Sequence, residues 1–173
     1  MTDRARFEQQ VLPHLDAAYN LARWLTRNDH DAEDVLQEAL VRALRFFGGL
    51  RGEPRPWLLA IVRNACFSWL QANRPAELVE ADEREPESEA PGPEALAARD
   101  LDRRRINDAI VALPFHYREV LVLRELEDLA YQDIARIAGI PMGTVMSRLA
   151  RARRLLAEAL RVIAPPPRLR LHK

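Results

Sequence analysis

The sequence predicts an all-α protein of two small helical domains joined by a flexible acidic linker. Three observations favour this fold: apolar residues recur at helical spacing in both halves, the centre is acidic and contains several prolines, and two helices near the C-terminus flank a glycine turn. A chain of 173 residues has room for two such domains. We expect domains at residues 1–74 and 99–164, the linker at 75–98 and a basic tail at 165–173.

The charge of the chain is divided into blocks. Lys and Arg total 26, as do Asp and Glu, and this balance taken alone speaks against a nucleic-acid-binding chain. Residues 1–74, however, carry ten Arg against nine acids, residues 75–100 two Arg against nine acids, and residues 101–173 fourteen basic residues against eight acids. The acidic block holds four prolines and few bulky apolar residues, which is typical of a flexible linker.

Several classes of function are disfavoured by the composition. The polar N-terminus and the short apolar run at 57–62 predict no membrane insertion and a cytoplasmic protein. Cys66 is the single cysteine, so an internal disulfide is excluded and a buried apolar role is expected. The four histidines lack metal-ligand spacing, and no glycine-rich phosphate loop is present. We therefore expect no enzyme, no catalytic residue, no metal and no cofactor.

The first domain is predicted to hold three helices. The stripe Val11, Leu15, Ala18, Ala22 and Leu25 predicts the first helix. A second helix is expected to be capped by Asp31. Its core seam is predicted at Leu36, Leu40, Leu44 and Phe47, with Ala39 and Ala43 beside it. Its outward face holds Asp34, Gln37, Glu38, Arg42 and Arg45, which periodicity alone interprets as a solvated surface.

A glycine- and proline-rich loop, FGGLRGEPRP, precedes a third helix predicted from Trp57 through Ala72. Trp57 and Trp69 alternate there with Arg and Asn residues, a combination that can stack unpaired bases and hold phosphates. The alternative is that both tryptophans belong to the core, above all Trp57.

The C-terminal domain contains a predicted helix-turn-helix. One helix ends at Pro114 and a second runs from Phe115 to about Glu125. A short helix then stops at Gly139, a suitable left-handed cap, and Pro141 can open the last helix. The core face of that last helix is predicted at Val145, Leu149, Ala152, Leu156, Leu160 and Ile163. Its opposite face presents Ser147, Ala150, Arg151, Arg154 and Arg161, flanked by Arg148 and Arg153, and indicates contact with a DNA major groove.

Three segments in order carry a family resemblance: DAEDVLQEALVRALRFF, RPWLLAIVRNACFSWL and LPFHYREVLVLRELEDLAYQDIARIAGIPMGTVMSRLARAR. Over nearly its whole length the chain resembles the extracytoplasmic-function (ECF) sigma factors of the sigma-70 family. The resemblance implies a sigma-2 domain at 1–74 and a sigma-4 domain at 99–164. It also implies binding to core RNA polymerase, recognition and melting of promoter DNA, and control by an anti-sigma factor.

The resemblance assigns expected roles to individual residues. The clamp coiled coil of the largest polymerase subunit would be bound by Asp34, Gln37, Glu38, Leu40 and Leu44, which replaces the solvated interpretation of that face, and the flap of the second subunit is a further expected partner. The −10 element would be contacted by Leu50, Arg51, Arg63, Asn64 and Arg74. The −35 element would be contacted by Thr144, Ser147, Arg148, Ala150, Arg151, Arg153 and Arg154. The acidic linker would enter the polymerase cleft.

Two other functions remain open from the residues. A helix-turn-helix regulator that binds duplex DNA without polymerase would explain residues 101–173 but leave the face around Gln37 and Glu38 without a role. An adaptor that mimics a sigma factor and titrates an anti-sigma factor would not need the basic face at Arg151 and Arg154.

Overall fold

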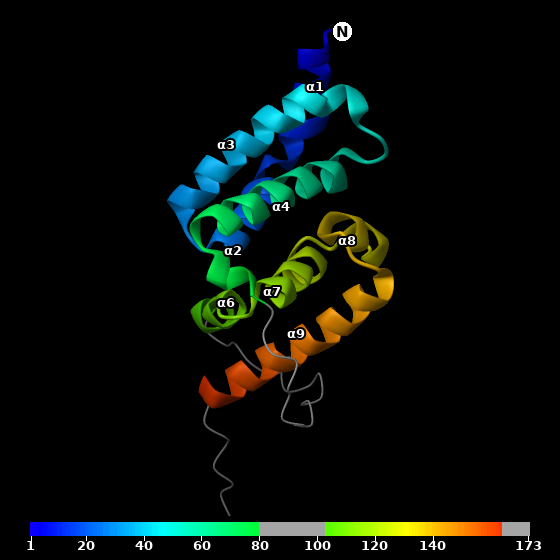
Figure 1. The fold of residues 1–173 in the computed structure, drawn as a ribbon. Coiled ribbons are helices and arrows are strands. Elements are labelled where there is room, and N and C mark those ends of the chain that lie inside the picture. The colour runs from blue at the N-terminus through cyan, green and yellow to red at the C-terminus, as the bar shows by residue number, and fades with distance from the viewer. Residues whose placement is uncertain (80–102, 164–173) are drawn as a thin grey trace, which may run out of the picture.

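The computed structural model describes residues 1–79 and 103–163, and every regular element within these ranges is a helix (Figure 1). The all-α prediction is therefore confirmed. Most of the predicted linker, residues 80–98, and the predicted tail at 165–173 lie outside the described residues.

The first domain consists of four α-helices and three short 3₁₀ turns. They are α1 (Asp3–Val11), η1 (Leu12–His14), α2 (Leu15–Thr26), α3 (Asp29–Phe46), η2 (Phe47–Gly49), α4 (Pro54–Asn73) and η3 (Pro75–Leu78). The predicted first helix is interrupted at η1, because Pro13 lacks an amide N–H and its ring opposes a continuous helix. The predicted stripe nevertheless faces the core on both sides of the break, with Val11, Ala18, Ala22 and Leu25 buried.

Two expectations for α3 were wrong. The N-cap is Asn28, whose Oδ1 accepts a hydrogen bond from the Asp31 amide at 3.0 Å. The buried seam is Ala32, Val35, Ala39 and Ala43. Leu36 and Leu40 are only half-buried and Leu44 is exposed, whereas Phe47 is buried as predicted. The physical reason is the close packing of α3 against α2 and α4, where small side chains fit and leucines do not.

The interior of the first domain is completed by α4. Pro54 occupies its first turn, and one side of the helix buries Leu58, Leu59, Val62, Ala65, Cys66 and Leu70. Trp57 is half-buried and meets the Phe47 ring edge-on, with 6.4 Å between ring centroids. Trp69 is also half-buried against the core. Both tryptophans therefore serve packing at least in part.

The second domain is the predicted helix-turn-helix with two preceding helices. It comprises α6 (Arg103–Val111), α7 (Phe115–Leu121), a π-helical turn η4 (Val122–Leu126), α8 (Tyr131–Ala138) and α9 (Met142–Ile163). Gly139 caps α8 in the left-handed region at φ 68°, and its N–H donates to the Ala135 carbonyl. The predicted glycine cap is confirmed. The predicted helix from Phe115 to about Glu125 is α7 followed by the π-helical turn.

The two domains pack on each other. Figure 1 shows α4 lying above α7 and α8, and α2 also contacts α7. Phe67 of α4 meets Phe115 of α7 with 5.9 Å between ring centroids. The buried apolar residues of both domains form one continuous cluster.

Candidate nucleic-acid interface and protein-binding face

The residues predicted to bind a protein partner share one face of α3. Asp34, Gln37, Glu38 and Leu44 are exposed, and Leu40 is half-buried. Asp34 is three and four residues from Gln37 and Glu38, and Leu40 is four residues from Leu44. The five residues therefore lie along one side of the helix. Glu38 pairs with Arg42 along the helix, and His30 Nε2 lies 3.6 Å from Asp34 Oδ2. We call the exposed part of this surface, Asp34, Gln37, Glu38 and Leu44 together with exposed Val41 between them, the α3 face; Leu40 lies at its half-buried edge.

The sequence interpretation missed Val41 on the α3 face. Val41 is 61% exposed, and Leu44 is 51% exposed. Val41 follows Gln37 by four positions and precedes Leu44 by three, so its spacing was a signal that could have found it. The α3 face thus places two large exposed aliphatic side chains beside acids and an amide.

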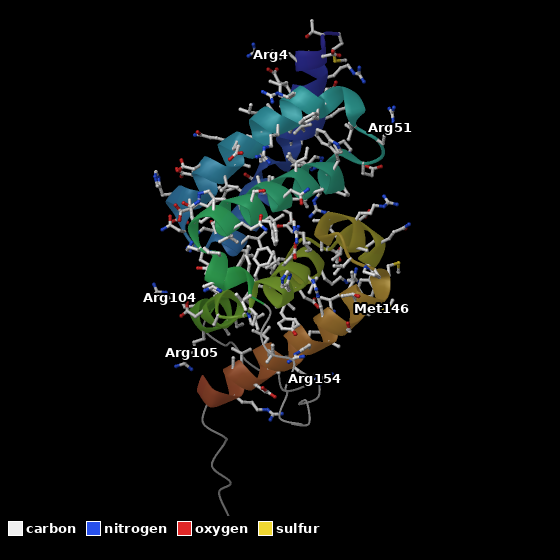
Figure 2. All side chains as sticks on the ribbon, in the orientation of Figure 1. Arg4, Arg51, Arg104, Arg105, Met146 and Arg154 are labelled. Atoms are coloured by element: carbon white, nitrogen blue, oxygen red, sulfur yellow. The ribbon has the colours of Figure 1, made fainter. Side chains whose placement is uncertain are left out.

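The five residues predicted to contact the −10 element are not gathered in one place. Leu50 is half-buried against the core, whereas Arg51 extends from the loop between α3 and α4 (Figure 2) and Asn64 is exposed on α4. Arg51 and Arg74 lie beyond opposite ends of the 20-residue α4, a helix about 30 Å long.

Arg63 and Arg74 are both engaged within the protein. Arg63 pairs with Glu119 of α7, and its side chain is only 12% exposed. Arg74 donates to the Thr26 carbonyl at 2.5 Å and contacts Glu77 and Asp31 at 3.2 and 3.5 Å. Its guanidinium also lies 4.7 Å from the centroid of the Trp69 ring. DNA contact by either arginine requires it to exchange partners.

The predicted −35 residues divide into an outward row and an inward pair. Ser147, Ala150, Arg153 and Arg154 are exposed, and Thr144 is half-buried. Figure 2 shows Met146 and Arg154 projecting outward from α9. Ser147 Oγ donates to the Thr144 carbonyl at 3.1 Å, and Arg153 Nη2 lies 2.6 Å from Glu125 Oε1.

Arg148 and Arg151 form the inward pair and face α7. Arg148 Nη1 lies 3.5 Å from His116 Nδ1, and the Arg151 guanidinium lies 5.3 Å from the centroid of the Tyr117 ring. Both side chains are half-buried. The outward row alone presents small residues flanked by cations, which is what close approach to a DNA groove requires.

Two titratable groups near the contact between the domains have raised pKa values. Burial raises the pKa of the Cys66 thiol to about 12, and the nearby Glu119 carboxylate adds to this. Burial also raises the pKa of Glu119, while Arg63 opposes that shift. No group of three or more His, Cys, Asp or Glu within the described ranges is arranged to hold a metal. Nor does any helix of the described part have the length and apolarity to cross a membrane.

The fold and its surfaces define a helix-turn-helix protein with a second helical domain, in which one face of α3 exposes two aliphatic side chains. The family model "Sigma-70 region 2" matches residues 11–75, and "Sigma-70, region 4" matches residues 103–156. With the relatives described next, these matches show that the chain belongs to the sigma-70 family, as an ECF RNA polymerase sigma factor.

Two relatives and one solved structure are similar to this chain over most of its length. The RNA polymerase sigma-H factor of Pseudomonas aeruginosa is 34% identical over 171 residues, covering 91% of this chain and 88% of the relative. The ECF RNA polymerase sigma-E factor of Escherichia coli K12 is 36% identical over 134 residues, covering 71% and 70%. The sigma factor RpoE of Bartonella quintana, solved in complex with the anti-sigma factor NepR, is 30% identical with a TM-score of 0.71, covering 92% and 99%.

Proposed function

We propose that this sigma factor binds core RNA polymerase, recognises the −35 and −10 elements of its promoters and promotes DNA melting. In this proposal residues 1–74 contact the polymerase clamp coiled coil and the −10 element, and residues 99–164 contact the −35 element and the polymerase flap. The protein makes and breaks no covalent bond. Its contribution is to hold polymerase and melted DNA in one geometry.

The observation that carries the proposal is the exposed apolar pair on the α3 face, Val41 and Leu44. A regulator that bound DNA alone would gain nothing from aliphatic side chains exposed on a helix remote from its helix-turn-helix. Burial of both side chains against a partner would stabilise a complex by about 1 kcal/mol each, because only about half of each residue is still exposed. The neighbouring Gln37 and Glu38 would supply polar and charged contacts that set orientation.

Recognition of the −35 element is proposed for the outward row of α9. Ser147 and Ala150 are small enough to let the helix approach base edges, and Arg154 can reach backbone phosphates. Arg151, beside this row, could reach guanine O6 and N7 on leaving the Tyr117 ring.

Recognition of the −10 element is proposed for the loop and helix that contain Arg51 and Asn64. Melting exposes unpaired bases, which are stabilised by a protein that offers hydrogen-bonding groups on a rigid support. Arg63, next to Asn64 on α4, would bind the backbone after releasing Glu119.

Control by an anti-sigma factor is also proposed. Support comes from the solved relative, whose structure contains a sigma factor with its anti-sigma factor and covers nearly the whole of this chain. The α3 face and the outward row of α9 are the surfaces that such a partner would have to cover to prevent initiation.

Run-off transcription with purified core polymerase and a cognate promoter tests the proposal. The full chain is expected to start transcription above core alone, and Gln37→Ala/Glu38→Ala to lose both core binding and transcription while keeping affinity for a −35 duplex. Gln9→Ala, an exposed change on α1, is the matched control and should retain both activities. No initiation above core, together with tight binding to duplex DNA, would instead identify a regulator that works without polymerase.

A further inference from the structure

Among the residues that the structure describes, two ion pairs connect the domains. Arg63 on α4 pairs with Glu119 on α7, and Arg55 at the start of α4 pairs with Glu127 at the end of η4. The second pair has 2.8 Å between Arg55 Nη2 and Glu127 Oε2. Both cations come from the first domain and both carboxylates from the second.

The Arg63–Glu119 pair is removed from water. Glu119 is fully buried, and its carboxylate would be costly there without a cationic partner. The Arg63 guanidinium also lies over two rings, 4.7 Å from the Phe67 centroid and 5.9 Å from the Phe115 centroid. Phe67 is in the first domain and Phe115 in the second, so the Arg63 guanidinium lies at the contact between the two domains.

A second buried arginine joins the domains through backbone carbonyls. Arg118 on α7 has no exposed surface, and its Nη1 donates to the Leu113 carbonyl at 2.6 Å. Its Nη2 donates at 3.4 Å to the carbonyl of Leu25 in the last turn of α2. Arg27 of the first domain donates in the other direction, to the Leu113 carbonyl. The negative end of the α2 dipole favours a cation at this point.

We infer that this contact is an internal lock, in which Glu119 occupies the Arg63 guanidinium that would otherwise bind promoter DNA. The lock is argued from the contacts above, and only the DNA role of Arg63 rests on the proposed function. One guanidinium cannot neutralise a buried carboxylate and a DNA phosphate in the same geometry. Promoter contact by Arg63 therefore requires α4 and α7 to separate.

The energetics of the lock suit reversible opening. A buried ion pair adds little net stability, because the attraction mostly offsets the desolvation of both charges. A phosphate can replace the carboxylate on the same two guanidinium donors. Polymerase and DNA together can therefore compete for Arg63 without having to supply the full energy of an ion pair.

Single-molecule energy transfer between the domains tests the lock on the full chain. Dyes are attached at Gln9→Cys on α1 and Gln132→Cys on α8, both exposed positions, in a Cys66→Ala background. Every protein also carries Arg55→Gln, which removes the second ion pair and raises the open population into the measurable range. Circular dichroism checks that the helices are retained.

Three substitutions are compared in that background. Glu119→Gln and Arg63→Gln should each raise the open-to-closed ratio about 30-fold, as loss of one member of a buried charge pair does. Arg42→Gln removes a guanidinium from a pair within α3 and should change the ratio by less than about twofold. If both interface variants match Arg42→Gln, the lock is overturned.

A DNA-binding measurement tests the DNA role of Arg63 separately from the lock itself. Anisotropy of a labelled single-stranded oligonucleotide at low salt should show about fivefold tighter binding to Glu119→Gln, which frees one cation for phosphate. Arg63→Gln should open equally and show no gain. If both variants open and Glu119→Gln gains no affinity, the lock stands and the DNA role of Arg63 is refuted.

Discussion

The guanidinium of Arg151 lies over the ring of Tyr117, 5.3 Å from its centroid, so a residue of the predicted −35 interface is held against α7 in this structure. Stacking of this kind stabilises a cation by about 0.5–2 kcal/mol. That is comparable to what a base contact offers, so the two interactions can exchange.

Arg151→Ala should weaken binding to a cognate −35 duplex by about 1–3 kcal/mol, with the loss confined to one base-pair position. Competition binding against duplexes altered at single positions measures it. Arg154→Ala is the matched comparison and should weaken all sequences alike, with a salt slope smaller by about one. An equal loss on scrambled DNA for Arg151→Ala would mean that Arg151 contacts only phosphate.

Arg118→Met should lower the free energy of unfolding by about 2–4 kcal/mol, because the Leu25 carbonyl would lose its Arg118 donor and the Leu113 carbonyl would keep only the 3.4 Å bond from Arg27. Burial lowers the pKa of Arg118 to about 10, which reflects how far its charge is withdrawn from water. Urea unfolding followed by circular dichroism gives the value. Arg4→Met, in the exposed Arg4–Glu8 pair, should change stability by less than about 0.5 kcal/mol. Equal effects of the two substitutions would contradict the structural role of Arg118.

Cys66 should make stability fall at alkaline pH. Its pKa is raised to about 12 by burial, so above the lower pKa of the unfolded thiol the unfolded chain loses its proton first and is favoured. Relative to Cys66→Ala, the wild type should lose about 1.4 kcal/mol between pH 8 and pH 10. The loss should continue until pH approaches the folded pKa. Urea unfolding of both proteins at each pH measures the difference, and a constant difference would show that the folded thiol ionises normally.

Gly139→Ala should destabilise the second domain by about 1 kcal/mol, because an alanine is strained at φ 68° although no atom lies within 4 Å of the added Cβ. Gly143→Ala is the matched control, since that glycine has no positive φ and is equally uncrowded. It should leave stability unchanged or raise it by up to about 0.5 kcal/mol. Thermal unfolding distinguishes the two. If both alanines are neutral, the left-handed cap contributes nothing to stability.

Features set by neighbouring residues could be predicted from the sequence. Gly139 followed by Pro141 determines where α8 ends and the last helix begins, and the cap forms as expected. The position of Asp34, Gln37 and Glu38 on an exposed face follows equally from helical spacing.

Features set by packing between distant segments could not be predicted. The α3 seam is centred on Ala32, Val35, Ala39 and Ala43 rather than on the leucines, because the packing of α3 against α2 and α4, which no local pattern records, decides which side of the helix lies innermost. Arg63 is paired with a carboxylate 56 positions away. Periodicity identifies Arg63 as a cation on a helix but carries no information about its partner.

The turn between α2 and α3 should tolerate substitution unevenly from one position to the next. The Leu25 carbonyl serves Arg118, the Thr26 carbonyl serves Arg74, and Arg27 holds a left-handed conformation while it donates to Leu113. Two of these three contacts use main-chain carbonyl oxygens of the turn, and the third uses the Arg27 side chain. In a saturation library, exposed Asn28 should accept Asp, Ser or Thr, which can also cap α3, and most other side chains should cost about 1 kcal/mol. Proline at Arg27 should be rejected, since its ring fixes a negative φ. Such a profile would mark a short surface turn as a shared structural element of both domains.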